Sequence, residues 1–271
     1  MEKIKYIIVS ILLLIVSSVS TAQTDAAEAK LFFPKAEIAL FETDNLGNIF
    51  IVNKQQQLIK YSKDLDSLQV YNNVQRFGVL SSIDVSNPLK VLLFYKDFST
   101  VVVLDRFLAE RAVIDFRKIG IYNANAISLA YDNQIWLYDE LNNTIKKIND
   151  NGEVSMEFND FRTLFETAPY PSKIIDNNGL IYVYDAKTGI LVMDYYGAYK
   201  FTLPIKEAQS LNIVNGKVLY IQNNILHFYS LLELQDKTTQ LPAQLGSGKN
   251  IKIEANKIWY NTNEGIFTIT F

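Results

Sequence analysis

The most regular feature of the chain is a series of short apolar runs bounded by turn residues. The runs are apolar at consecutive positions, which indicates strands buried on both faces. They are too short, and too rich in Ile, Val, Tyr and Trp, to suggest buried helices. Six such runs follow one another at a spacing of about 40 residues, over residues 49–52, 91–95, 135–138, 180–184, 218–221 and 258–260.

Asn, Asp and Gly flank these runs, as in residues 176–179 before the fourth run and 187–189 after it. These residues tolerate the positive φ that tight hairpins require, so each unit reads as strand, turn, strand, turn, strand. Outer strands are predicted over residues 67–71, 112–115, 154–158, 199–203 and 237–241. A repeat of this length built only of strands predicts an all-β chain, a β-propeller with six blades. Five or seven blades would also fit the uneven spacing.

The sixth unit lacks an outer strand, because the chain stops at Phe271 inside its third strand. Residues 30–33 form a short strand-like segment near the other end of the chain. Pairing of the N- and C-terminal strands would complete the sixth blade and leave no free sheet edge in the ring. The sequence therefore predicts a propeller closed by its two ends.

The first 22 residues have the pattern of a signal peptide. Lys3 and Lys5 precede an apolar stretch over residues 6–16, and small residues end in Ala22. The alternative is a membrane anchor, but the apolar core of about 11 residues is shorter than the roughly 20 that span a bilayer. We expect residues 1–22 to be removed, residues 23–271 to form a single propeller domain, and the protein to be periplasmic or extracellular.

Composition narrows the possible functions further. The chain has no cysteine, which excludes disulfides, thiolate nucleophiles and cysteine zinc sites. A single domain of this size can bury enough core to fold without a disulfide. The formal net charge of −3 gives no electrostatic reason to expect nucleic-acid binding. No segment after the signal peptide could span a membrane, and we expect a monomer.

The strands and turns of residues 176–194 resemble NHL- and quinoprotein-like propeller repeats, and residues 132–139 resemble them similarly. The likeness extends over nearly all of residues 23–271. It implies an exported propeller of the kind abundant in Bacteroidota. The Gly-His and Trp-Asp marks of WD40 blades, the sialidase box and the regular tryptophans of quinoprotein blades are missing. The resemblance therefore implies a fold and no particular activity.

Catalytic chemistry has few candidates in this chain. His227 is the only histidine, and it lies in an apolar third strand with no nucleophile in its motif. Carboxylates beside the expected innermost strands could instead converge in the central channel and bind calcium. We predict no cofactor, with calcium as the alternative. The channel candidates are Glu37, Asp84, Asp132, Asp176 and Glu254, with Glu42 close by. Turn formation alone also explains Asp132 and Asp176.

Arginine is confined to one stretch of the chain. Because arginine binds carboxylates and stacks on aromatic rings, a cluster of arginines would suit an interface. The candidates are Arg76, Arg106, Arg111, Arg117 and Arg162. Tyr170, Tyr195, Tyr196 and Tyr199 lie in or beside loops and could add to such a surface.

These features favour a non-enzymatic exported propeller that binds a protein or glycan in the bacterial envelope, as an interaction partner or scaffold. The alternative is a calcium-dependent enzyme, similar to lactonases or lyases, that uses carboxylates lining the central channel. The two hypotheses differ in a structural detail. An enzyme of this kind requires at least three of the channel carboxylates within a few ångströms of one point.

Overall fold

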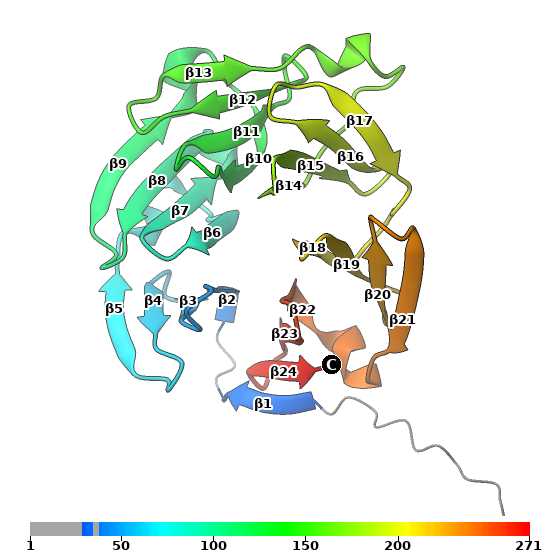
Figure 1. The fold of residues 1–271 in the computed structure, drawn as a ribbon. Helices are drawn as coiled ribbons and strands as arrows, with labels where there is room; N and C mark the ends of the chain where they lie inside the picture. Colours follow the sequence, from blue (N-terminus) through cyan, green and yellow to red (C-terminus); the bar gives the residue numbers. More distant parts are fainter. Residues whose placement is uncertain (1–28, 35–37) are drawn as a thin grey trace, which may run out of the picture.

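The computed structural model describes residues 29–34 and 38–271. Within this part of the chain the strands form six four-stranded antiparallel sheets, arranged as blades around a central axis (Figure 1). The predicted six-bladed propeller is therefore confirmed. The predicted signal peptide lies outside the described residues. No helix in residues 29–34 and 38–271 is long and apolar enough to cross a membrane.

Each of the first five blades is a meander that starts at the channel and ends at the rim. From the innermost strand outward, blade 1 contains β2 (Ile38–Thr43), β3 (Ile49–Asn53), β4 (Leu58–Tyr61) and β5 (Ser67–Tyr71), and blade 2 contains β6 (Ser82–Asn87), β7 (Lys90–Tyr95), β8 (Thr100–Asp105) and β9 (Glu110–Asp115). Blade 3 contains β10 (Ala124–Leu129), β11 (Ile135–Asp139), β12 (Thr144–Ile148) and β13 (Val154–Glu157). Blade 4 contains β14 (Lys173–Asn177), β15 (Leu180–Asp185), β16 (Gly189–Asp194) and β17 (Tyr199–Leu203), and blade 5 contains β18 (Ser210–Val214), β19 (Lys217–Gln222), β20 (Ile225–Ser230) and β21 (Gln235–Gln240).

Blade 6 combines the two ends of the described chain. Its first three strands are β22 (Lys249–Ile253), β23 (Lys257–Asn261) and β24 (Ile266–Thr270), and its outermost strand is β1 (Ala29–Phe33). β1 runs antiparallel to β24, with Ala29 opposite Ile269 and Lys30 opposite Thr268. The predicted closure by N- and C-terminal strands is confirmed, and Figure 1 shows β1 lying beside β24.

The second strand of each blade explains the apolar runs of the sequence. All five residues of β11 are buried, and Trp136 and Tyr138 are completely inaccessible to solvent. One face of the strand packs against blade 2 and the other against blade 4, so both faces must be apolar. The core of the molecule therefore lies between blades and leaves the axis open.

The turns also follow the chemistry that their sequence predicts. Asp105 Oδ1 accepts hydrogen bonds from the backbone N–H groups of Phe107 (2.8 Å) and Ala109 (2.9 Å). Asp194 Oδ1 accepts the corresponding bonds from Tyr196 and Ala198, both at 2.9 Å. A side-chain acceptor thus shapes the same tight turn in two blades.

Alternating strand directions divide the connections between two faces of the ring. The turns between the first and second strands and between the third and fourth strands lie on one face. The turns between the second and third strands, and the connections from one blade to the next, lie on the other face. This assignment decides which loops surround each end of the channel.

Candidate functional site

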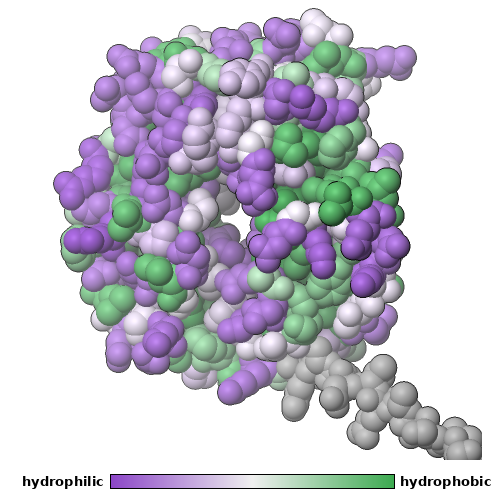
Figure 2. All heavy atoms as spheres, viewed as in Figure 1, coloured by the Kyte–Doolittle hydropathy of each residue, from purple (hydrophilic) through white to green (hydrophobic). Residues whose placement is uncertain are grey.

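A cavity of about 910 Å³ follows the axis of the propeller and is lined by all six innermost strands. The opening is visible at the centre of the ring in Figure 2. Its two ends differ in charge. We call the end where the innermost strands begin the lysine mouth, lined by Lys96, Asn125, Tyr170, Ser172 and Lys173. We call the opposite end the acidic mouth, lined by Glu42, Asp44, Asp84, Asp176 and Glu254.

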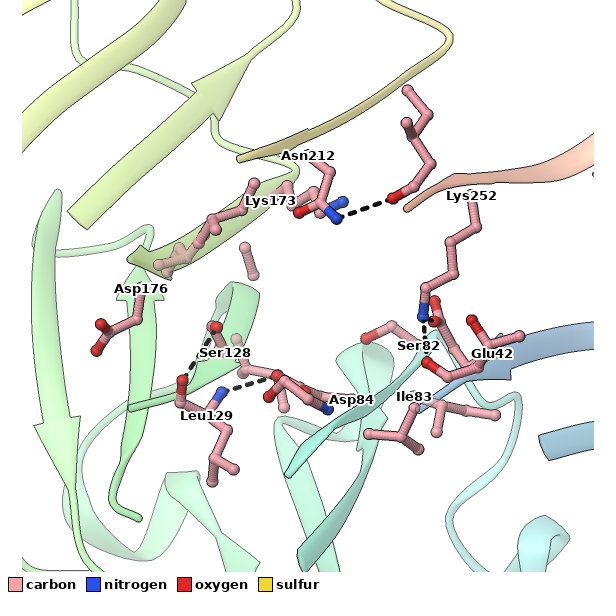
Figure 3. A pocket seen from close by; sticks show the side chains of 18 of the residues that line it. Glu42, Ser82, Ile83, Asp84, Ser128, Leu129, Lys173, Asp176, Asn212 and Lys252 are labelled. Carbon is pink, nitrogen blue, oxygen red and sulfur yellow. Dashed lines mark hydrogen bonds and ion pairs between the residues drawn. The ribbon is translucent and has the colours of Figure 1, made fainter. Parts of the chain in front are cut away.

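Two of the carboxylates at the acidic mouth join blade 6 to blade 1. Glu42 forms an ion pair with Lys252, and the Lys252 ammonium also donates to the backbone oxygen of Thr43 at 2.8 Å. The Thr43 hydroxyl donates in turn to the Glu254 carboxylate. Glu42 and Lys252 face each other across the two innermost strands in Figure 3. These groups hold the seam at which the ring closes.

Asp84 and Asp176 approach blade 3 from its two neighbours. Asp84 Oδ2 accepts the backbone N–H of Leu129 at 2.8 Å, as Figure 3 shows. Asp176 Oδ2 accepts the indole N–H of Trp136 at 2.9 Å and the backbone N–H of Tyr131 at 3.1 Å. The Tyr195 hydroxyl donates to the other oxygen of Asp176. Both carboxylates therefore stabilise the turn between β10 and β11.

The predicted metal candidates do not converge on one point. Within residues 29–34 and 38–271, no three His, Cys, Asp or Glu side chains are grouped so that they could hold a metal ion. Asp84, Asp176 and Glu254 line the channel, each with the separate partner described above. Asp132 does not line it, and Glu37 lies outside the described residues.

Asp132 instead shapes the turn that follows β10. It accepts the backbone N–H of Gln134 at 3.2 Å and pairs with the Lys147 ammonium at 2.9 Å. Burial disfavours the charged carboxylate, but the hydrogen bonds from Lys147 and Gln134 outweigh it and lower the pKa of Asp132. The turn role that the sequence suggests for Asp132 matches these contacts, whereas Asp176 lies within β14 and bonds across to blade 3.

The lysine mouth contains two cations that face the cavity. Lys96 contacts Tyr170, with its ammonium 3.2 Å from the phenol oxygen and 5.1 Å from the ring centroid. The Lys173 ammonium donates to the backbone oxygen of Leu211 at 2.7 Å. Lys173 is reached only through the channel, and this desolvation lowers the pKa of its ammonium group. Among the described residues, no carboxylate lies within ion-pair distance of either lysine or lines this mouth.

Asn125 is the most unusual polar residue of the channel. It lies near the start of β10, only 7 % exposed, and its side chain lines the cavity. Neither its amide oxygen nor its amide nitrogen has a hydrogen-bond partner in the described part of the chain. Buried side-chain amides are nearly always paired, since an unpaired one loses its hydration without compensation. This exception indicates that something else satisfies the amide.

The predicted arginines divide between the two faces of the ring. Arg76, Arg117 and Arg162 lie in the connections between consecutive blades 1 to 4, on the face of the lysine mouth. Arg106 and Arg111 lie at the turn between β8 and β9, on the other face. A single patch containing all five is therefore wrong, and three of them share one side.

A short motif accounts for two of these three arginines. In both blade 2 and blade 3, an Asp-Phe-Arg sequence starts the 3₁₀ helix that leads to the next blade: η4 (Phe116–Ile119) after Asp115 and η5 (Phe161–Thr163) after Asp160. The phenylalanine of each is fully buried. Arg117 Nε lies 2.9 Å from Asp115 Oδ1, and Arg162 Nε lies 2.8 Å from Asp160 Oδ2. Each guanidinium is thus held flat against its own loop.

Exposed apolar side chains collect around these three arginines. Six of them lie on the face of the lysine mouth and form what we call the apolar arc: Val79, Phe98, Tyr122, Leu141, Leu164 and Tyr170. All belong to blades 2 and 3 or to the connections that run from blade 1 to blade 4. In the described residues, no large exposed apolar side chain on this face comes from the turns of blades 5, 6 or 1.

Phe98 shows that the apolar arc is a built surface. It is 43 % exposed and packs over Gly78, whose φ is +81°. A Cβ at Gly78 would lie 2.8 Å from the ring of Phe98, so glycine is required for this contact. The guanidinium of Arg117 lies 6.0 Å from the Phe98 ring centroid. The ring is therefore fixed although half of it faces solvent.

The single histidine lies outside the channel. His227, in β20, stacks on Tyr220 with ring centroids 4.3 Å apart, and its Nδ1 lies 2.7 Å from Asp236 Oδ2. These contacts belong to the outer part of blade 5, and His227 does not line the cavity. The structural role expected from its sequence context agrees with this position.

Sequence reasoning missed Lys96, Asn125 and Lys173. Lys96 sits in a turn and Lys173 begins a strand, and lysines are common at both kinds of position. Asn125 carried a weak signal, since it is the one amide in the otherwise small and apolar residues 124–127. Its missing partners became apparent only when the blades were assembled around the cavity.

No known family model matches the sequence, and no curated protein matches it. Solved structures that are similar to this chain are all remote in sequence. A catalytically inactive histidine-to-alanine variant of virginiamycin B lyase from Staphylococcus aureus, with quinupristin, has a TM-score of 0.64 and 12% identity over 90% of this chain and 99% of its own. The Pan2 WD40 domain of Neurospora crassa has a TM-score of 0.60 and 12% identity over 90% and 85% of the two chains.

BamB from Moraxella catarrhalis is also similar, with a TM-score of 0.50 and 12% identity over 85% of this chain and 82% of its own. These likenesses support the propeller repeat that the sequence resembles. At this level of identity they establish the fold alone. The chain is thus a six-bladed β-propeller with structural relatives that include a lyase and a WD40 domain.

Proposed function

We propose that the protein is a non-enzymatic, exported propeller of the bacterial envelope that binds a partner through the apolar arc, and that this partner is a protein. The observation that carries the proposal is the confinement of the apolar arc to half of one face. Exposed apolar residues scattered singly are normal, whereas contiguous ones indicate an interaction site.

The composition of the arc favours a protein over a glycan. Tyr122 and Tyr170 are 60 % and 55 % exposed, and Leu141 is 59 % exposed. Arg117 and Arg162 lie among them. Aromatic residues and arginine are enriched at the centres of protein interfaces, and aliphatic side chains such as Leu141 contribute little to sugar binding. The ion pairs to Asp115 and Asp160 hold these arginines in place before a partner arrives.

The alternative, a calcium-dependent lactonase- or lyase-like enzyme, is supported less well. Its candidate carboxylates at the acidic mouth already accept hydrogen bonds from backbone or side-chain groups of the neighbouring blade. The lyase in the comparison loses catalysis on replacement of a histidine, and His227 of this chain lies away from the channel.

The proposal can be tested with matched substitutions on the two faces. A Tyr122→Ser, Leu141→Ser double variant should lose a partner that copurifies with the wild-type protein from envelope fractions. Leu232→Ser, on the opposite face and 92 % exposed, should retain it. Since all three side chains are exposed, the folded state should be unaffected. Equal recovery with both variants, or wild-type protein found outside the envelope, would refute the proposal.

A further inference from the structure

We propose that the lysine mouth is a binding site for a sugar acid, a small hydroxylated molecule that carries a carboxylate. This inference goes beyond the protein-binding role and does not depend on it. It rests on three independent features of the mouth: uncompensated positive charge, an unpaired buried amide and a fixed aromatic ring.

The charge of the mouth selects an anion. Lys96 and Lys173 both face the cavity, and neither has a carboxylate partner among the described residues. An ammonium group has three donors, and the only acceptors given to Lys173 and Lys96 are the Leu211 carbonyl and the Tyr170 hydroxyl. A ligand carboxylate would use the remaining donors in strong, charge-assisted hydrogen bonds.

The opposite end of the channel makes the position of the anion specific. The five carboxylates of the acidic mouth are balanced there by Lys252 alone. A carboxylate that enters the channel is therefore attracted at one end and repelled at the other. This gradient keeps the charged group of the ligand beside Lys96 and Lys173.

Asn125 identifies the rest of the ligand as hydroxylated. Its amide offers both donors and an acceptor, and all of them are unpaired. A sugar hydroxyl is also both a donor and an acceptor, so it can satisfy the two ends of the amide. An apolar ligand would leave the amide unpaired and would gain nothing from it. Ser82 and Ser172 line the same cavity and add further hydroxyl groups.

Tyr170 provides a rigid surface for a ring. Its backbone N–H donates to Asp185 Oδ2 at 2.9 Å, and the preceding carbonyl, of Pro169, accepts the Tyr138 hydroxyl at 2.8 Å. Pro171 follows, so the backbone on both sides of Tyr170 is restricted. The side chain itself is 55 % exposed at the rim of the cavity. The cavity of about 910 Å³ has ample room for one or two sugar rings.

Isothermal titration calorimetry on the purified protein tests the inference, with D-glucuronate and D-galacturonate as probes. At least one of them should bind, and neutral methyl glucoside should bind at least tenfold more weakly. Lys96→Met and Asn125→Leu should each weaken binding of the acid at least tenfold. The matched control is Lys252→Met, which removes a lysine from the acidic mouth of the same channel and should leave binding unchanged.

Each contrary outcome is decisive. Equal binding of the acid and the neutral sugar, or an equal loss in Lys252→Met, would overturn the assignment to the lysine mouth. Tighter binding of glucose 6-phosphate than of glucuronate would replace the carboxylate by a phosphate and refute the sugar acid. No heat and no thermal stabilisation by either acid would do the same. Lys96→Met alters only a half-buried side chain, so it carries the test if Asn125→Leu does not fold.

Discussion

The two mouths of the channel are built from the same six strands, yet their polar groups are used differently. At the acidic mouth, carboxylates such as Asp84 and Asp176 are saturated by donors from the next blade. At the lysine mouth, Lys96 lacks a carboxylate partner and Asn125 has no partner at all among the described residues. A polar residue that faces a cavity is thus informative only once its hydrogen bonds have been counted. The more charged end of this channel is the more structural one.

Removal of Asp176 should break the acidic mouth most severely. Asp176→Ala leaves the buried indole N–H of Trp136 and the N–H of Tyr131 without acceptors. We expect a loss of about 3 kcal/mol in the free energy of unfolding, measured by urea titration. Asp64→Ala, at an exposed turn, is the control and should change stability by less than about 0.5 kcal/mol. Similar losses in the two variants would show that Asp176 does not hold blade 3.

Asp185 links stability to the shape of the lysine mouth. Burial opposes its ionisation, but hydrogen bonds from the N–H groups of Tyr170 and Lys187 and from the Thr188 hydroxyl outweigh it and lower its pKa. We expect Asp185→Asn to cost about 2 kcal/mol at neutral pH, because charge-assisted bonds are lost.

The sign of the pH effect follows from that lowered pKa. A carboxyl group with a depressed folded-state pKa contributes stability above its unfolded pKa of about 3.9 and loses it as the pH falls through the folded value. Unfolding curves of wild type and Asp185→Asn should therefore differ at neutral pH and converge in strong acid. A difference that stays constant with pH would exclude the ionised carboxylate as its cause.

The same substitution at both mouths should give unequal results. Lys252→Met removes the partner of Glu42 and a donor to Thr43, which should cost about 1 kcal/mol. Lys96→Met removes only a contact with the exposed Tyr170, which should cost less than about 0.5 kcal/mol. Thermal unfolding of the two variants in low salt measures both. A larger loss at Lys96 would reverse the comparison.

Asn125→Ala should have the smallest effect and the opposite sign. Relief of two unpaired buried atoms favours the variant, while lost packing offsets part of the gain. We expect the ligand-free protein to become more stable by about 0.5 kcal/mol, as urea titration would show. A residue kept at a cost to stability is typical of a binding site. Destabilisation of the variant would instead indicate that the amide has a structural role.

The sequence predicted the architecture well because the architecture depends on local patterns. Five consecutive buried residues in β11 reflect a strand between two blades, and residues 135–139 display this directly. Asp105 and Asp194 shape their turns through neighbours two and four positions away. Even the closure by β1 followed from a missing strand in the sixth unit. These signals all lie within a few residues of the feature that they predict.

The site could not be predicted in the same way, because its contacts join distant parts of the chain. Asp176 bonds to the backbone of Tyr131, 45 positions away, and Lys96 reaches Tyr170 across 74 positions. Nothing near Asn125 in the sequence shows that its amide remains unpaired. The Asp-Phe-Arg motif at Asp115 and Asp160 was visible, but its meaning required the loops that follow it. Charge clustering in the sequence therefore located half of the interface and none of the cavity.

The pairing of β1 with β24 has a consequence for the life of the protein in the cell. Residues 29–33 are synthesised early, and their partners at residues 266–270 are among the last to be made. A nascent or truncated chain therefore exposes an unpaired strand edge, and such edges attract aggregation and proteolysis. The closing strand pair thus acts as a quality control, because only a chain translated through its final blade can seal the ring.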